Sequence, residues 1–353
     1  MKIVYTDAHL QHDPPYEFAR DGMYPYSECA TRVESIHQAL EKSDVDFVAP
    51  QTHPPAALLA VHDADYLHFL EHIYPAWSAA GRPATGVIPE TFAVRNLNTR
   101  PALLLRQSGY YCFDAQTPIV EGTYSAALAA AHCALTGADL LLAGDRAAYV
   151  LCRPPGHHAG RALYGGYSYL NNAALAAAHL LPRGPVAILD IDYHHGNGTQ
   201  DIFYTSDQVL FISLHADPNR AYPFFSGHAA EQGADAGAGY NRNFPLPAST
   251  DDTHYLDVLD QALDLIKQFV PTHLIVSTGL DIYRDDPLGD FDLSQDAFSH
   301  IGSHIAALSL PTLLVQEGGY NIDQAGALII NLLNAWPTLP LRALHDPHPK
   351  NTR

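Results

Sequence analysis

Short apolar runs alternate along the chain with longer stretches in which apolar residues recur at helical spacing. The apolar runs predict strands, which we expect at 2–6, 147–151, 186–192, 209–215, 273–281 and 312–316. The Ala- and Leu-rich stretches predict helices, which we expect at 122–138, 171–181, 252–269 and 294–308. Because the strands are almost entirely apolar and helices separate them, the pattern predicts an α/β fold. In such a fold, helices cover both faces of a parallel sheet.

Polar side chains gather where these strands end. The 186–192 strand runs into Tyr193 and His194, and the 273–281 strand ends at Asp281. The last predicted strand runs into Glu-Gly-Gly-Tyr, which ends at Tyr320. Open parallel sheets bind ligands beyond the carboxyl ends of their strands. We therefore expect the functional site at that edge of the sheet.

Asp192, His194 and Asp281 are the first candidate group. Residues i and i+2 of an extended chain point to the same side, so the Asp192 and His194 side chains can converge. Two carboxylates and one imidazole leave an open position, which is typical of a catalytic zinc site. The same ligands also suit Fe²⁺, Co²⁺ or Mn²⁺. In the alternative interpretation, the two aspartates cap helices and His194 lies on the surface.

His157 and His158 are adjacent in the stretch RPPGHH and form the second group. Consecutive side chains diverge, so each imidazole needs its own partner, and Asp190 and Asn197 are available. A carboxylate favours a charged imidazole, whereas an amide orients the ring with less stabilisation of its charge. Pairing His157 with Asp190 and His158 with Asn197 would give one cationic and one neutral ring, which suits acid–base catalysis. Taken alone, a His-His pair is equally typical of an ordinary loop.

The turn that ends at Tyr320 is the third group. Its two glycines allow close backbone approach, and a phenol there can donate to a developing oxyanion. An ordinary turn has the same sequence. Together, the three groups predict metal-dependent amide hydrolysis, in which a neutral His takes the proton from an activated water. The chain has no G-x-S-x-G, Walker A or G-x-G-x-x-G motif, so covalent serine catalysis and nucleotide-phosphate binding lack support.

The composition narrows the class of protein further. The 38 acidic and 19 basic residues give a net charge of −19 at pH 7, which argues against nucleic-acid binding and against docking to anionic membranes. The 4 cysteines form no C-x-x-C pair and the N-terminus predicts a strand rather than a signal peptide, so we expect a cytoplasmic protein. The window 125–143 contains His132 and Asp139 and predicts a packed helix rather than a membrane span. The 21 histidines indicate metal or proton chemistry.

Residues 81–118 interrupt the alternation of strands and helices with scattered Pro and Gly. Such a long excursion from a sheet usually serves a function. The chain has no internal repeat and no low-complexity linker. We therefore expect a single domain over 1–353, with 81–118 as an insertion.

The motifs RPPGHHA, GGYSYLNNAA, LDIDYHHGNGTQDIFY, SLHADP, STGLDIYRDDPLG and EGGYN span nearly the whole chain. In this order they resemble the histone deacetylase and acetylpolyamine amidohydrolase family. The resemblance implies the arginase–deacetylase fold, in which a single, mostly parallel sheet of about eight strands has helices on both faces. It also implies a zinc site formed by Asp192, His194 and Asp281.

The resemblance assigns catalytic roles as well. It implies that His158 is the general base and later the general acid, and that His157, paired with Asp190, is its electrostatic partner. It makes Tyr320 the residue that polarises the carbonyl. Asn197, where some members have Asp, resembles the class II and amidohydrolase branch.

The family also holds structural monovalent cations, usually potassium, largely through backbone oxygens. The residues that match the first such site are Asp190, Asp192, His194, Ser213 and Leu214. Those that match the second are Phe203, Ser206, Val209 and Tyr240. The resemblance also makes Tyr167 and Phe225 aromatic walls around the acyl chain, and Leu288 an apolar rim position.

The sequence GYYCFDAQTPI, together with the residues before it, resembles the bacterial acetylpolyamine amidohydrolases. In that branch the insertion helps to build a dimer and narrows the entrance. We therefore expect a homodimer that acts on small acetylated polyamines or diamines. Leu288 stands where animal polyamine deacetylases have a Glu, so another acid must meet the distal ammonium. The candidates are Glu17, Glu90, Asp114 and Glu121.

Three other interpretations use the same residues. A protein acetyl-lysine deacetylase or a broad-specificity amidohydrolase shares the chemistry but needs a wider entrance. A catalytically silent sensor would be favoured by loss of a metal ligand or of Tyr320, and none is lost. A binuclear manganese hydrolase of the arginase type needs carboxylates that the HHGNG run lacks.

Overall fold

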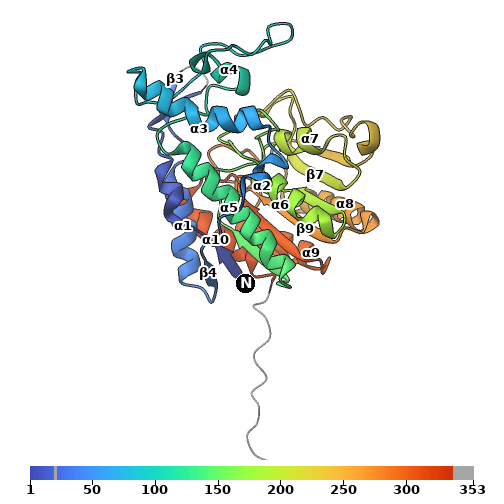
Figure 1. Ribbon diagram of the computed structural model, residues 1–353. Helices are drawn as coiled ribbons and strands as arrows, with labels where there is room; N and C mark the ends of the chain where they lie inside the picture. Colours follow the sequence, from blue (N-terminus) through green and yellow to red (C-terminus); the bar gives the residue numbers. More distant parts are fainter. Residues whose placement is uncertain (20–21, 337–353) are drawn as a thin grey trace, which may run out of the picture.

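The computed structural model describes residues 1–19 and 22–336. Eight strands form one sheet in the order β4-β1-β5-β10-β9-β6-β7-β8, and all neighbouring strands are parallel (Figure 1). Its strands are β1 (Lys2–Val4), β4 (Asp46–Val48), β5 (Ala147–Val150), β6 (Val186–Asp190), β7 (Val209–Ala216), β8 (Asn241–Leu246), β9 (His273–Thr278) and β10 (Thr312–Gln316). The expected single parallel sheet of about eight strands is therefore confirmed.

The two edge strands, β4 and β8, were not among the expected strands. Their sequences, DFV and NRNFPL, contain polar and partly exposed residues, because an edge strand is not covered as a central strand is. A separate antiparallel hairpin pairs β2 (Tyr16–Ala19) with β3 (Gly22–Pro25).

Helices cover both faces of the sheet. One buried apolar cluster joins the sheet to α1, α8, α9 and α10, and a second joins it to α5 and α6. The helices are α1 (Ala30–Glu41), α2 (Pro55–Leu59), α3 (Ala64–Ala79), α4 (Ser108–Tyr111), α5 (Thr123–Leu142), α6 (Asn172–Leu180), α7 (Asn197–Phe203), α8 (Asp252–Phe269), α9 (Gln295–Ala306) and α10 (Ile322–Leu333). All four expected helices are present, and their ends lie within a few residues of the expected ones.

Side-chain caps explain where several of these helices begin. Asn171 accepts a hydrogen bond from the backbone N–H of Ala174 at the start of α6, and Asp251 accepts one from His254 at the start of α8. Such caps satisfy backbone donors that have no partner inside the helix.

Helix α5 has the length and hydropathy of a membrane span, and it is the only helix among the described residues that does. Of that apolar stretch, 61% is buried inside the fold, where α5 contributes Ala130, Cys133 and Ala134 to the cluster beneath the sheet. This burial is typical of a core helix, as the sequence predicts.

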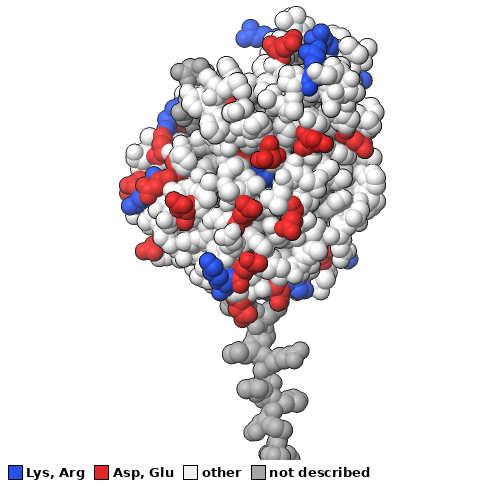
Figure 2. All heavy atoms as spheres, turned by 90° about the vertical axis from the view of Figure 1, so that its left-hand side faces the viewer, with Lys and Arg blue, Asp and Glu red and all other residues white. Residues whose placement is uncertain are grey.

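Residues 81–118, which include α4, lie at the end of the molecule near α3 (Figure 1). Their inner side chains, including Val87, Tyr111 and Cys112, join Phe69 and Ile73 of α3 in a third apolar cluster. By contrast, Leu97 is 77% exposed. Figure 2 shows one face of the molecule, on which acidic side chains are widely spread and no continuous basic patch is visible.

Candidate active site

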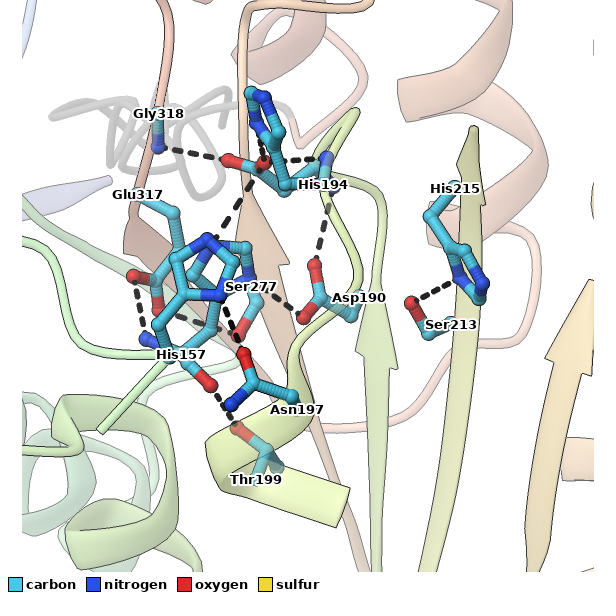
Figure 3. A network of polar contacts seen from close by, with 12 residues as sticks. His157, Asp190, His194, Asn197, Thr199, Ser213, His215, Ser277, Glu317 and Gly318 are labelled. Atoms are coloured by element: carbon cyan, nitrogen blue, oxygen red, sulfur yellow. Dashed lines mark hydrogen bonds and ion pairs between the residues drawn. The ribbon is translucent and has the colours of Figure 1, made fainter. Parts of the chain in front are cut away.

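The candidate site forms where three central strands end side by side. Asp190 at the end of β6 lies opposite Ser277 of β9, and Gln316 at the end of β10 lies opposite Thr278 of β9. The residues that follow these strands therefore meet at one edge of the sheet. The loop after β5, which carries His157 and His158, joins them there (Figure 3).

Asp192, His194 and Asp281 converge as the sequence predicts. One ligand atom from each lies within 4.8 Å of the other two. His194 Nδ1 is 3.0 Å from Asp281 Oδ2 and 3.3 Å from Asp192 Oδ1. Backbone N–H groups hold both carboxylates, since Tyr193 donates to Asp281 at 2.9 Å and Gly318 donates to Asp192 at 2.8 Å.

The charges of this group fit a divalent cation. Burial and the nearby charge of Asp192 raise the pKa of Asp281 to about 7. Burial opposes protonation of His194, but hydrogen bonds to the two carboxylates outweigh it and raise the pKa of His194 to about 9. Two buried carboxylates that repel each other in this way are stabilised by a positive charge between them. The oxygen and nitrogen donors suit Zn²⁺ and related metals.

The two adjacent histidines have the partners expected from the sequence. His157 Nδ1 lies 3.0 Å from Asp190 Oδ2 (Figure 3). His158 Nδ1 lies 2.7 Å from Asn197 Oδ1. Burial disfavours the cation of His157, but the charges of Asp192 and Asp190 raise its pKa to about 10. Burial, with the charges of His157 and His194, holds the pKa of His158 well below its usual value. At neutral pH, His157 is therefore cationic and His158 neutral.

Glu317 links the loop that carries the His pair, its own turn and strand β9. One of its carboxylate oxygens accepts hydrogen bonds from the backbone N–H of Gly156 at 2.6 Å and of His157 at 3.1 Å. The other accepts a hydrogen bond from Ser277 Oγ at 3.3 Å (Figure 3). Burial raises the pKa of Glu317 to about 7. These bonds fix the position of the His loop relative to the turn that carries Tyr320.

Arg32 and Asp286 hold that turn and were not found from the sequence. The Arg32 guanidinium donates to the backbone oxygens of Gly319 and Glu317 and lies 4.6 Å from the centroid of the Tyr320 ring. Asp286 accepts a hydrogen bond from the Tyr320 N–H at 2.6 Å. Burial raises the pKa of the Tyr320 phenol well above its usual value, so the hydroxyl stays a donor.

Aromatic rings lie beside the His pair and beside Tyr320. Tyr167 lies edge-on to Tyr320, with ring centroids 5.9 Å apart. Phe225 is 93% exposed, and among the described residues its ring contact is with Phe224. Its role as an aromatic wall stays a prediction. Tyr222, three residues earlier, has its ring centroid 5.1 Å from that of His158. Phe224 has a φ of 66°, so the turn sends neighbouring side chains in directions that sequence spacing does not predict.

The candidate acids for the substrate ammonium are in different surroundings. Glu17 is buried and hydrogen-bonded to Tyr167 and Ser27, and burial raises its pKa. Asp114 contacts Tyr222 and lies near the site. Glu90 does not join them: its side chain is 79% exposed and lies 3.6 Å from Arg106.

Two further candidates lie toward the outside of the molecule. Glu121 is exposed and lines a surface hollow of about 510 Å³ between α3 and the start of α5. Leu288 is half-buried on the loop after Asp281, where its N–H donates to Asp286 at 2.9 Å. Because Asp286 also bonds the Tyr320 turn, that loop is joined to the catalytic edge.

The residues expected to hold monovalent cations gather in two places. Asp190 lies opposite Ser213 across β6 and β7, and Leu214 follows in β7. Phe203 ends α7, Val209 begins β7, and the Tyr240 carbonyl accepts a hydrogen bond from the Phe211 N–H at 2.9 Å. Ser206 lies between α7 and β7. Potassium binding at these places stays a prediction.

Comparison with known proteins identifies the family of this chain. Residues 26–336 match the histone deacetylase domain, so the chain belongs to that family. It is 40% identical over 342 residues to acetylpolyamine amidohydrolase 1 of Pseudomonas aeruginosa, covering 95% of this chain and 99% of that one. It is 42% identical to acetylpolyamine amidohydrolase of Mycoplana ramosa, covering 94% and 98% of the two chains. The crystal structure of acetylpolyamine aminohydrolase from Burkholderia pseudomallei superposes with a TM-score of 0.90 at 38% identity, covering 95% and 98%.

Proposed function

We propose that this protein is a zinc-dependent hydrolase that removes acetyl groups from small acetylated polyamines or diamines and releases acetate and the free amine. The convergence of Asp192, His194 and Asp281 beside a cationic and a neutral histidine carries this proposal. The names of the relatives from Pseudomonas aeruginosa and Mycoplana ramosa support the substrate class.

The protein's own residues divide the work of hydrolysis. When bound by the three ligands, zinc supplies a Lewis acid for the acetyl carbonyl and lowers the pKa of water. His158 is neutral and takes a proton from the attacking water, then gives it to the leaving amine. His157 stays cationic beside Asp190 and stabilises developing negative charge. Tyr320 keeps its proton and donates to the carbonyl oxygen as that oxygen gains charge.

A cationic substrate suits the acids around the site. Glu17 is buried against Tyr167, which places a carboxylate beside an aromatic wall. We propose Glu17 as the acid that meets the distal ammonium of the substrate. The net charge of −19 further favours the approach of small cations and disfavours nucleic acid as a partner.

Several accompanying properties belong to the same proposal. The metal is zinc, with Fe²⁺, Co²⁺ or Mn²⁺ as chemically suitable replacements. Potassium binds at the two backbone-oxygen sites, and the protein is a cytoplasmic homodimer without membrane contact. Residues 1–353 form one deacetylase domain, in which the 81–118 segment narrows the entrance and contributes to the dimer. The exposed Val94, Leu97 and Leu103 side chains of that segment suit burial against a second copy.

The substrate class is tested by comparing kcat/KM for N-acetylputrescine, N-acetylcadaverine and the acetylspermidines with that for an acetyl-lysine peptide. We expect the small amines to be preferred by at least about tenfold, a difference of about 1.4 kcal/mol in transition-state binding. A large preference for the peptide would overturn the proposal and favour a protein deacetylase.

A further inference from the structure

Asp114 links the 81–118 segment to two separate parts of the candidate site. Its Oδ2 accepts hydrogen bonds from the Gly166 N–H at 2.7 Å and from the Tyr222 hydroxyl at 2.8 Å. Its Oδ1 accepts one from the Gln116 N–H at 3.1 Å, and the Thr117 hydroxyl also donates to the carboxylate. One side chain therefore joins the insertion, the turn after the His pair and the loop after β7.

The groups that Asp114 holds face the catalytic residues. The Tyr222 ring stands edge-on to His158, with centroids 5.1 Å apart, and to His194, with centroids 6.2 Å apart. The Phe113 ring, next to Asp114 in sequence, stacks with the Tyr222 ring at a centroid distance of 6.1 Å. The position of Tyr222 is thus fixed from the insertion by a hydrogen bond and by a ring contact.

The turn that contains Gly166 and Tyr167 depends on the same segment. Gly166 and Tyr167 have φ values of 54° and 63°, a conformation that is unfavourable for Tyr. Hydrogen bonds from the Gly166 N–H to Asp114 and from the Tyr167 N–H to Thr117 Oγ1, at 3.0 Å, hold the turn in it. Because Thr117 donates onward to Asp114, both bonds lead to one carboxylate.

The carboxylate has little capacity left for a substrate. An ionised Asp offers about four lone-pair sites, and four donors from the protein already occupy Asp114. A substrate ammonium would have to displace one of them. This argues against the sequence-based expectation that Asp114 binds the distal ammonium.

We propose that Asp114 is instead a positioning residue that holds Tyr222 beside His158 and Tyr167 beside Tyr320. This inference rests on the proposed deacetylase function. The insertion then acts on the reaction at His158 through a hydrogen-bond network, and Asp114 needs no direct contact with the substrate.

Asp114→Asn tests the proposal, because the amide keeps the shape of the carboxylate but loses its charge. Its NH2 group is also a donor and faces donor groups of the protein. We expect kcat/KM to fall about tenfold to a hundredfold, as for small misplacements in active sites. The fall should be the same for N-acetylputrescine and for N-acetylbutylamine, which lacks the distal ammonium. A fall confined to N-acetylputrescine would overturn the proposal and make Asp114 a binding residue. An unchanged kcat/KM for both would also overturn it.

Tyr222→Phe is the second variant, since it removes one oxygen and keeps the ring, so the claim stays testable even if the Asn variant fails to fold. We expect it to lower kcat/KM for both substrates. The double variant, Asp114→Asn with Tyr222→Phe, should have the same kcat/KM as the less active of the two single variants. Additive losses would show that Asp114 does not act through Tyr222. Asp257→Asn, an exposed Asp on α8, is the matched control.

If the wild-type protein cleaves neither amine, the proposed function fails first, and the variants are then compared on an acetyl-lysine peptide and its neutral analogue.

Discussion

The catalytic edge of the sheet and the 81–118 segment are built by opposite means. At the sheet edge, Asp190, Asp192, Asp281 and Glu317 are all 0% exposed and are held by backbone N–H groups from other strands and loops. The insertion exposes Leu97 and has little regular structure of its own. The difference indicates that the buried core fixes the sheet edge, whereas the insertion is fixed mainly through its few buried side chains.

The largest effect is expected at the sheet edge, when one metal ligand is removed. Asp281→Asn takes away a charged ligand, so we expect bound metal to be lost and kcat to fall by about a thousandfold or more. Metal analysis and steady-state kinetics measure both changes. Asp285→Asn, an exposed neighbour on the same loop, should keep its metal. Full metal content in Asp281→Asn would contradict the ligand assignment.

The two histidines should differ although they are adjacent. His158→Ala removes the neutral base, and we expect kcat to fall by about a hundredfold to ten-thousandfold. His157→Ala removes a positive charge that does not transfer the proton, so its loss should be smaller. Both are measured as kcat at saturating substrate with metal content checked. Equal losses, or the reverse order, would disprove the division of roles.

Tyr320→Phe tests the third part of the catalytic edge. The ring and its contact with Arg32 remain, but the donor to the oxyanion is gone. We expect kcat to fall by about a hundredfold to a thousandfold with unchanged metal content. Activity within a few-fold of the wild-type protein would rule out this role for the hydroxyl.

The smallest effect concerns the stability of a buried histidine that lies outside both regions, at the start of α6. Buried His62 accepts a hydrogen bond from the Asn171 N–H at its Nε2, and its Nδ1 lies 3.2 Å from the Arg161 carbonyl, so the neutral ring fits the site. Burial lowers the pKa of His62 from 6.5 to about 4. Between these values the unfolded chain binds more protons than the native protein. Stability should therefore decrease as pH falls from about 6.5 to 4.

His62→Gln keeps one donor and one acceptor but does not titrate. We expect its Tm to fall less than that of the wild-type protein over this pH range, as thermal unfolding at several pH values will show. His300→Gln, at an exposed position on α9, should follow the wild-type curve. An identical pH dependence in the His62 variant would disprove the linkage.

The sequence predicted the catalytic edge well because its residues occur in short motifs at strand ends. In a parallel sheet those ends lie at one edge whatever the loops do, so Asp192, His194 and Asp281 could be grouped without coordinates. The partners of His157 and His158 followed from elementary charge arguments.

Contacts between distant segments could not be predicted in the same way. Arg32 reaches a carbonyl 285 residues away at Glu317, and Asp114 meets Tyr222 across 108 residues. Neither pair has a local pattern, because each depends on how α1 and the insertion pack. The side-chain directions of Tyr222 and Phe225 depend on backbone angles in that loop, such as the φ of 66° at Phe224, which composition does not reveal.

The order of strands also has a consequence for how the protein acquires its activity. His194 and Asp281 are 87 residues apart in sequence, yet they follow neighbouring central strands. Pairing such distant strands is a slow step of folding, because the loop-closure entropy is lost before the contacts form. We therefore expect metal capture to follow assembly of the centre of the sheet. A metal that binds only the assembled state also stabilises it by mass action, so newly made chains should gain resistance to unfolding at the moment they gain activity.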